Sequence, residues 1–318
     1  MSEVALVGLT ATGKSEAAVA LARRRGDVEI VSVDSMCVYR GMDLATSKPS
    51  APVRREIRHH MVDLVEPDQE YTVAEFQAGA RTAVADIAAR GREALLVGGT
   101  GLYLRAVVDD LAIPGRYPDV LGQLEHQLDE GRVDVVALHA RLGELDPVAA
   151  GRIVPNNRRR VLRALEVTLG SGRPFSEFGP GLEAYPPARM PMVGIAMELG
   201  VVDRRIEERF ERWIDLGLVE EVRALAARRE GISKTARQAL GYREILAHVE
   251  RGAPLDECVA EAVRRTKSFA RRQAQWFRRD PRIDWVEPGP GLLEALDRAL
   301  GSGAIEAGPG VPAHGSPT

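Results

Sequence analysis

The residues with the clearest chemical signal lie near the N-terminus, where the chain carries a phosphate-binding loop pattern. Eight consecutive residues match G-x-x-x-x-G-K-[ST], namely Gly8, Leu9, Thr10, Ala11, Thr12, Gly13, Lys14 and Ser15. Glycines let backbone N–H groups converge on phosphate oxygens, and the positive end of a following helix favours the same anion. Lys14 can neutralise the outer phosphates, and the Ser15 hydroxyl can ligate Mg²⁺. The pattern predicts a site for a phosphate chain without identifying the compound that carries it.

The order of elements around this loop supports the prediction. Residues 4–7 form an apolar run typical of a buried strand, and the Ala-rich stretch 16–25 is typical of a helix. Thr72 followed by Glu75 predicts a capping box at the start of a helix over 72–90. Further strands are expected at 29–33, 94–97 and 192–197. We therefore predict an α/β fold, with a P-loop NTPase-like parallel sheet core flanked by helices and an all-helical insertion domain.

The insertion is placed by a change in pattern after Pro114. From there to Phe178 the sequence shows helical periodicity and no strand-like run. The last residues are rich in Gly, Pro, Ser and Ala and have little to bury. The expected domains are a first part of the core at 1–112, the insertion at 113–188, a mostly helical continuation of the core at 189–300 and a disordered tail at 301–318.

Two strand ends carry further candidate groups, at the edge where ligands bind in parallel sheets. Asp34 follows the second predicted strand and could hold Mg²⁺ through water, take a proton as a general base, or simply form a turn. The third predicted strand runs into Gly98, Gly99 and Thr100 rather than the carboxylate of a typical P-loop ATPase. A hydroxyl and small residues at this position disfavour a motor ATPase and favour a site that grips a leaving phosphate group.

Composition and charge exclude several classes of protein. The 318 residues are 45% hydrophobic and 28% charged, which is ordinary for a globular protein of about two domains. No apolar run is long enough to span a membrane and no signal peptide is visible, so we expect a cytoplasmic protein without membrane contact. Cys37 and Cys258 have no metal-type spacing and suit a reducing compartment. A net charge of −3 argues against a general nucleic-acid coat.

Positive charge is nevertheless concentrated in two acid-free stretches. One contains Arg264, Arg265, Lys267, Arg271, Arg272, Arg278 and Arg279, and the other contains Arg158, Arg159, Arg160 and Arg163. Such patches can bind a polyanion locally, and the aromatic and amide side chains over 269–277 are of the kind that contact unpaired bases. Either stretch could equally be a solvated helix face with its aromatics buried. One of Arg204, Arg205 and Arg209 could also reach over the phosphates from a further helix, and helical spacing alone does not assign which.

Taken together, these segments resemble the bacterial tRNA isopentenyl-transferase family, the tRNA dimethylallyltransferases. The matching segments are the loop at 8–15, 34–43 (DSMCVYRGMD), 46–49 (TSKP), 59–60 (HH), 97–103 (VGGTGLY), 156–167 (NNRRRVLRALEV), 237–242 (RQALGY) and 271–277 (RRQAQWF). The loop alone is common to many families. The ordered set, which covers the chain from residue 3 to about 279, is highly specific.

The resemblance implies a reaction and the residues that perform it. Dimethylallyl diphosphate donates its allyl group to the N6 amine of the adenosine 3′-adjacent to the anticodon in the tRNA anticodon stem-loop, and diphosphate leaves with the help of Mg²⁺. Asp34 is then the general base, Thr10 and Thr100 contact the donor phosphates, and Arg205 is the charge clamp. The residues implied to contact tRNA are Asp34, Ser35, Met36, Cys37, Thr100, Arg159, Arg160, Arg163 and Gln273. We expect the protein to act as a monomer.

One position departs from the family pattern, and two other functions stay open. Many relatives carry Asp-Pro-x-x-Arg with the arginine touching tRNA, whereas the comparable stretch here is Tyr117-Pro-Asp-Val-Leu121. The loop, Asp34 and an insertion would also suit a small-molecule or nucleotide kinase that turns over ATP. A non-catalytic RNA-binding regulator could use the loop as a nucleotide sensor. The basic helix over 264–279 argues weakly against the kinase, and the sequence does not decide whether ATP binds the loop.

Overall fold

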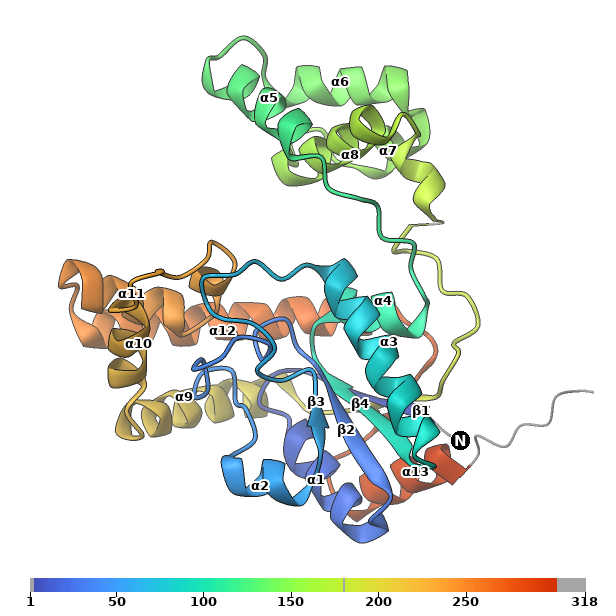
Figure 1. Ribbon diagram of the computed structural model, residues 1–318, viewed down its shortest axis with the longest axis vertical. Helices are drawn as coiled ribbons and strands as arrows, with labels where there is room; N and C mark the ends of the chain where they lie inside the picture. Colours follow the sequence, from blue (N-terminus) through green and yellow to red (C-terminus); the bar gives the residue numbers. More distant parts are fainter. Residues whose placement is uncertain (1–2, 180, 302–318) are drawn as a thin grey trace, which may run out of the picture. The chain divides into compact units, whose positions relative to one another are not determined.

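A six-stranded parallel sheet forms the centre of the fold (Figure 1). In this computed structural model, which describes residues 3–179 and 181–301, the strand order is β3-β2-β4-β1-β5-β6. The strands are β1 (Glu3–Val7), β2 (Val28–Val33), β3 (His59–His60), β4 (Glu93–Gly98), β5 (Met192–Ile195) and β6 (Ile283–Val286). Consecutive apolar residues in β1, β2 and β4 are buried, as parallel strands between two helical layers require. The predicted α/β class is confirmed.

Helices cover both faces of this sheet. Those that pack on the strands are α1 (Lys14–Arg25), α3 (Val73–Ala89) and α13 (Pro290–Gly301). The same part of the chain also contains α2 (Ala51–Glu56) and α4 (Gly101–Val108). On one face, Leu21 of α1 and Leu296 of α13 pack with Val4 and Leu95 of the strands. The helix α3 packs against β2 and β4 and begins with the predicted capping box, in which the Glu75 N–H donates to Thr72 Oγ1 at 3.2 Å.

A second group of helices packs together, and two of its members also pack against the phosphate loop. Its members are α9 (Leu199–Asp215), α10 (Leu218–Ala226), the short helix η2 (Ala236–Gln238), α11 (Tyr242–Arg251) and α12 (Leu255–Phe277). Leu9 and Ala11 of the loop are buried in one cluster with Ile206 and Phe210 of α9 and Ala270 of α12. The loop that follows β1 is therefore anchored by apolar side chains from far along the chain.

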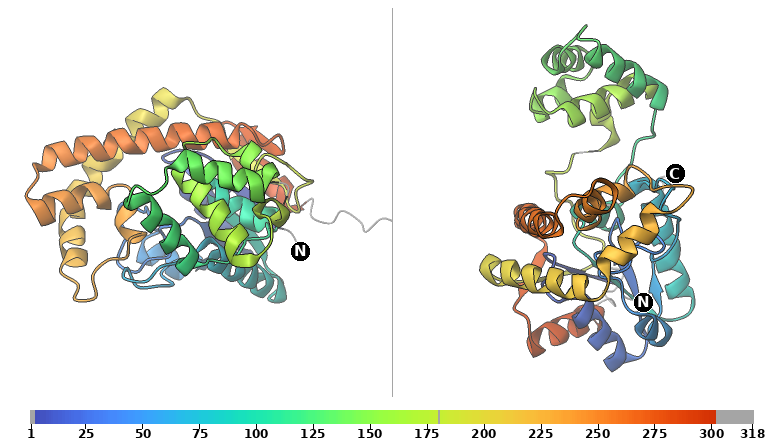
Figure 2. Two further views of the ribbon diagram at one scale, coloured as in Figure 1. Left: turned by 90° about the horizontal axis from the view of Figure 1, so that it is seen from above. Right: turned by 90° about the vertical axis from the view of Figure 1, so that its left-hand side faces the viewer.

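The remaining helices form a compact unit of their own, Arg105–Pro187, while the described residues up to Leu104 and from Ala188 onward form the first unit. Figure 2 shows these helices gathered into one bundle. They are α5 (Pro118–Asp129), α6 (Val135–Leu145), α7 (Pro147–Arg152), α8 (Arg158–Ser171) and the short helix η1 (Phe175–Phe178). Leu124, Leu138, Leu142 and Val161 form the centre of their core. In the described part of this unit there is no strand.

The compact unit begins before the expected boundary at 113, and a buried arginine explains why. Arg105 is only 2% exposed and forms an ion pair with Asp109. Its guanidinium also donates to the backbone carbonyls of Leu182 and Ala184, at 3.1 and 2.6 Å. The outgoing and returning segments of the chain are thus joined here. The tail expected to be disordered lies outside the described residues from position 302 onward.

No helix within residues 3–179 and 181–301 combines the length and the hydrophobicity that crossing a lipid bilayer demands.

The glycines that follow β4 allow three different close contacts. A Cβ atom at Gly98 would lie 2.1 Å from the Val33 carbonyl oxygen of the neighbouring strand. One at Gly99 would lie 2.4 Å from the amide nitrogen of Gln273, and one at Gly101 would lie 2.2 Å from the indole nitrogen of Trp276. Real Cβ atoms do not approach other atoms this closely, so any larger residue would displace β2 or α12.

We expect Gly98→Ala to destabilise the first unit by about 2–3 kcal/mol, because the methyl group must displace backbone rather than a mobile side chain. Tryptophan fluorescence during urea unfolding measures this, since Trp213, Trp276 and Trp285 are the only tryptophans and all lie in the first unit. The control is Gly200→Ala in α9, where nothing lies within 4 Å of the added Cβ. A Gly98→Ala protein as stable as the Gly200→Ala protein would contradict the close contact.

Candidate active site

The strand register brings three candidate segments to one edge of the sheet. Val7 of β1 and Val33 of β2 both pair with Gly98 of β4. The residues that come next on the three strands are the start of the phosphate loop, Asp34 and Gly99, with Thr100 one position further. The expectation that these groups emerge together at the carboxyl edge is confirmed.

The phosphate loop closes on itself between β1 and α1. Gly13 has a φ of 94°, in the left-handed region that glycine adopts without strain. The Thr12 hydroxyl donates to the Leu9 carbonyl at 2.9 Å, and the Lys14 ammonium donates to the same carbonyl at 2.5 Å. Lys14 is therefore folded back over the loop, whereas Ser15 lies exposed in the first turn of α1. The loop has the backbone shape and the cation that binding a phosphate chain requires.

Gln273 of α12 ties the phosphate loop to the end of β4. Its amide oxygen accepts the Thr10 N–H at 2.9 Å, and its amide nitrogen donates to the Gly99 carbonyl at 2.8 Å. The side chain is 6% exposed. Buried amides with both ends hydrogen-bonded hold their neighbours in register. The structure thus gives Gln273 a bridging position, and the contact with tRNA expected for it stays a prediction.

Two arginines one turn apart on α9 reach the phosphate loop. The Arg205 guanidinium donates to the Ala11 carbonyl at 3.3 Å. The Arg209 guanidinium donates to Thr10 Oγ1 at 3.4 Å and to Ser47 Oγ at 3.5 Å. Helical spacing left Arg204, Arg205 and Arg209 open, and the family resemblance singled out Arg205; the structure brings Arg209 to the loop as well, because the i, i+4 spacing places both on one helix face. Either cation could contact an anion held by the loop.

Asp34 forms a turn and still has a free oxygen. Its Oδ1 accepts the backbone N–H groups of Met36 at 2.7 Å and Cys37 at 3.4 Å. Its Oδ2 has no hydrogen-bond partner within residues 3–179 and 181–301. Burial raises the pKa of Asp34, and the two N–H groups and the charge of Lys14 oppose that rise. The carboxylate is thus both a turn former and a candidate base, so the two interpretations of Asp34 are compatible.

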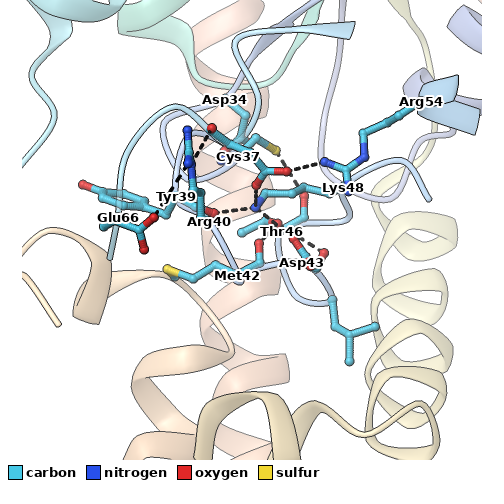
Figure 3. Close-up of polar contacts among 12 residues, drawn as sticks. Asp34, Cys37, Tyr39, Arg40, Met42, Asp43, Thr46, Lys48, Arg54 and Glu66 are labelled. Atoms are coloured by element: carbon cyan, nitrogen blue, oxygen red, sulfur yellow. Dashed lines mark hydrogen bonds and ion pairs between the residues drawn. The ribbon is translucent and has the colours of Figure 1, made fainter. Parts of the chain in front are cut away.

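A buried lysine holds the segment that follows Asp34 in the sequence (Figure 3). The Lys48 side chain is 1% exposed, and its ammonium donates to Asp43 at 2.9 Å, to Asp63 at 2.6 Å and to the Tyr39 carbonyl. The Cys37 thiol donates to the Thr46 carbonyl at 3.5 Å. Burial raises the pKa of Cys37, which leaves this thiol protonated and unreactive. Charged and polar contacts therefore fix the course of the chain from Asp34 to Lys48.

Lys14 differs from a surface lysine in its protonation. Burial and the charge of Arg209 lower its pKa to about 8, although Asp34 and Glu16 act in the opposite direction. A dianionic phosphate group would restore the charged form, because an opposite charge stabilises the ammonium. The site therefore favours an anionic ligand.

The residues present could bind Mg²⁺ only when the phosphates of a ligand supply some of its oxygen ligands. Within the described part of the chain, no group of three or more His, Cys, Asp or Glu side chains could hold a metal ion. Ser15 and Glu16, both exposed beside the loop, offer one hydroxyl and one carboxylate. Mg²⁺ bound through substrate phosphates keeps several waters and needs only one or two protein oxygens. The donor set meets that need and does not amount to an all-protein metal site.

Most of the basic residues on α12 have acidic partners from other parts of the fold. Lys267 pairs with Glu207 of α9 at 2.5 Å, and Arg271 pairs with Asp203 of α9 at 2.7 Å. Arg264 pairs with Glu261, and Arg265 pairs with Glu244 of α11 at 3.0 Å. For these four residues the structure therefore favours a helix face whose charges are paired over a free polyanion-binding patch.

Two of the four arginines of α8 have acidic partners, and one of these is Arg158, which lies 3.4 Å from Asp129. Arg163 pairs with the buried Glu166 at 2.9 Å and donates to the Pro114 carbonyl at 2.8 Å. Arg159 and Arg160 are exposed, and no acidic partner for them lies in the described residues. Arg163 thus stabilises its own unit, while Arg159 and Arg160 are available to a polyanion. Leu121, at the position where many relatives have an arginine, packs against the core of this unit.

Comparison with known proteins agrees with this geometry. A family model described as IPP transferase matches residues 37–280. The tRNA dimethylallyltransferase of Desulforudis audaxviator is 44% identical over 94% of this chain and 96% of its own. That of Geobacter metallireducens is 46% identical, over 92% and 94%.

Solved structures are similar as well. The tRNA isopentenylpyrophosphate transferase of Bacillus halodurans has a TM-score of 0.67 and is 34% identical, with 94% of this chain and 96% of that chain covered. A eukaryotic dimethylallyltransferase that acts on tRNA has a TM-score of 0.73 at 22% identity, over 96% and 78% of the two chains, which shows a shared fold alone. By the family model and by these relatives, the chain belongs to the IPP transferase family.

Proposed function

We propose that this protein transfers a dimethylallyl group from dimethylallyl diphosphate to the N6 amine of the adenosine 3′-adjacent to the anticodon in tRNA, with release of diphosphate. The observation that supports it most is the convergence of the phosphate loop and the Asp34 carboxylate at one sheet edge, in a chain whose relatives are named tRNA dimethylallyltransferases. Family membership disfavours the kinase and the non-catalytic regulator. We also propose that the protein acts as a monomer.

In this proposal the phosphate loop binds and stabilises the diphosphate that leaves the donor. As the carbon–oxygen bond of the donor breaks, its electron pair stays with the diphosphate, whose charge rises. Backbone N–H groups of the loop, Lys14 and the guanidinium groups of Arg205 and Arg209 surround the place where this charge develops. Fixed donors and cations in a half-buried site lower the barrier because they need not reorganise during the reaction. In this proposal Thr10 and Thr100 also contact the donor phosphates.

In this proposal Asp34 activates the acceptor amine by taking its proton. The lone pair of an exocyclic adenine amine is delocalised into the ring, so the amine is a weak nucleophile. While the new carbon–nitrogen bond forms, the nitrogen loses a proton, which the free Oδ2 of Asp34 accepts. Burial raises the pKa of this carboxyl and thereby strengthens it as a base. Mg²⁺, held by Ser15 and the phosphates, would neutralise part of the diphosphate charge when bound.

The tRNA has to present an unstacked adenosine to this edge of the sheet, as enzymes that modify bases generally require. In this proposal Ser35, Met36 and Cys37, which follow Asp34 directly, lie against the RNA. Arg159 and Arg160 of the helical unit supply unpaired positive charge for its phosphates.

Asp34→Asn tests the base. The asparagine oxygen can still accept the Met36 and Cys37 N–H groups, so the turn should persist while the proton acceptor is lost. Incubation with labelled dimethylallyl diphosphate, Mg²⁺ and unmodified tRNA, followed by nucleoside analysis, should show transfer by the wild-type protein and a turnover lower by roughly 10²-fold or more in the variant. The dissociation constant for tRNA should change little. A wild-type protein that forms no prenylated adenosine would refute the proposed function.

The pH dependence of donor use tests Lys14. Because burial lowers the pKa of Lys14 to about 8, its ammonium is present below that pH and is lost above it. We therefore expect kcat/KM for the donor to fall as the pH rises through about 8. In Lys14→Arg the guanidinium stays charged to about pH 12, so this decline should disappear even if the absolute rate is lower. A decline of the same size in both proteins would assign it to another group.

The salt dependence of tRNA binding tests the exposed arginines. Replacing Arg159 and Arg160 with Gln should reduce the slope of log Kd against log salt by about 1.5, as expected for two lost phosphate contacts. The control is Arg173→Gln, which removes an exposed arginine of the same unit that pairs with Glu177. An unchanged slope in the double variant would mean that these two side chains do not meet the RNA backbone.

A further inference from the structure

The segment 237–242 belongs to the family resemblance, yet the proposed reaction assigns it no role. It ends at Tyr242, the first residue of α11, which is 1% exposed. The Tyr242 hydroxyl donates to Oε1 of Glu221 on α10 at 2.5 Å. A buried hydroxyl bonded to a carboxylate is a strong, charge-assisted contact, and its loss leaves the carboxylate with an unmet acceptor.

The same carboxylate holds a turn of the chain beyond Asp34. Glu221 accepts the Asp43 N–H at 3.0 Å and the Leu44 N–H at 3.2 Å. These residues begin a turn, in which the Ser47 N–H donates to the Leu44 carbonyl at 2.9 Å and the Lys48 N–H donates to the Asp43 carbonyl at 3.1 Å. The turn approaches α11 so closely that a Cβ atom at Gly241 would lie 2.9 Å from that of Ala45.

The far end of this turn meets the phosphate loop. Ser47 has a φ of 54°, a left-handed conformation that a residue with a side chain adopts only when its surroundings impose it. Its hydroxyl accepts from the Arg209 guanidinium at 3.5 Å, and the same guanidinium nitrogen donates to Thr10 Oγ1 at 3.4 Å. A continuous path of contacts thus joins Tyr242 to the loop through Glu221, the turn at 43–48 and Arg209.

We propose that Tyr242 and Glu221 are positioning residues that keep Arg209 directed at the phosphate loop. They act through the turn at 43–48, whose Ser47 holds the guanidinium on one side while Thr10 holds it on the other. A long arginine side chain loses much conformational freedom when it binds an anion, and holding it in place beforehand reduces that cost. The inference rests on the proposed function only in that the loop grips the diphosphate that leaves the donor.

Binding of inorganic pyrophosphate with Mg²⁺, measured by titration calorimetry on the full chain, tests this path without any prenyl transfer. We expect Tyr242→Phe to raise the dissociation constant about tenfold, the usual consequence of losing a charge-assisted hydrogen bond. In the Arg209→Ala background the same substitution should have almost no effect, because the residue that it positions is gone. Ser47→Ala, at an exposed position that should not affect folding, should raise the constant about threefold through the same arginine.

The control is Thr235→Val. This change removes a hydroxyl that donates to Glu70 from the same region between α10 and α11 without touching the turn at 43–48, so pyrophosphate binding should be unaffected. Hydrogen exchange of the Asp43 and Leu44 amides should accelerate in Tyr242→Phe and not in the control.

Three outcomes would overturn the inference: equal weakening by Tyr242→Phe with and without Arg209, weakening by Thr235→Val of the same size, or a wild-type protein that does not bind pyrophosphate. The proposed function fails separately. A protein that shows the Tyr242–Arg209 coupling but transfers no dimethylallyl group to tRNA would refute the reaction and leave the positioning pair in place.

Discussion

The register of three neighbouring strands is the constraint on which the site depends. Gly98 pairs with Val7 on one side and Val33 on the other, so the phosphate loop and Asp34 leave the sheet at the same level with one strand between them. Strands lie about 4.8 Å apart, which separates the loop and the carboxylate by about 10 Å at their origins. In the proposed reaction, that spacing leaves room for a diphosphate and a reacting carbon between the phosphate loop and the Asp34 carboxylate. The arrangement needs glycine at position 98, because β2 and β4 approach each other there more closely than a side chain permits.

Burial shifts the pKa values of both Asp34 and Lys14 in directions that favour binding of an anionic ligand and acceptance of a proton. It raises the pKa of Asp34 and lowers that of Lys14 to about 8, because a half-buried environment disfavours either charge. In the proposed reaction, an arriving diphosphate supplies a counter-charge for Lys14 and for the two arginines of α9. Asp34, in turn, gains proton affinity that a fully hydrated carboxylate lacks. One physical cause thus serves both halves of the proposed reaction, the leaving group and the base.

A cluster of basic residues in the sequence does not show which of them are free to bind RNA in the folded protein. The stretch 264–279 contains no acid, yet Lys267 and Arg271 form ion pairs with carboxylates of α9 in the folded chain. On α8 the local sequence cannot separate Arg163, which pairs with a buried glutamate, from Arg159 and Arg160, which have no such partner in the described residues. A helix face becomes an RNA-binding surface only where the rest of the fold leaves its cations unpaired.

Local sequence patterns were enough to predict the α/β class, the phosphate loop, the capping box at Thr72 and the convergence of the loop, Asp34 and Thr100 at one sheet edge. These follow from local patterns: apolar runs, glycine spacing and the rule that parallel strands end at one edge. Only the folded chain shows that Gln273 bridges the loop to β4, that Arg209 as well as Arg205 reaches the loop, and that the helical unit begins at Arg105. Each of these depends on contacts between residues far apart in the chain, and no local pattern specifies which distant side chain fills a given space.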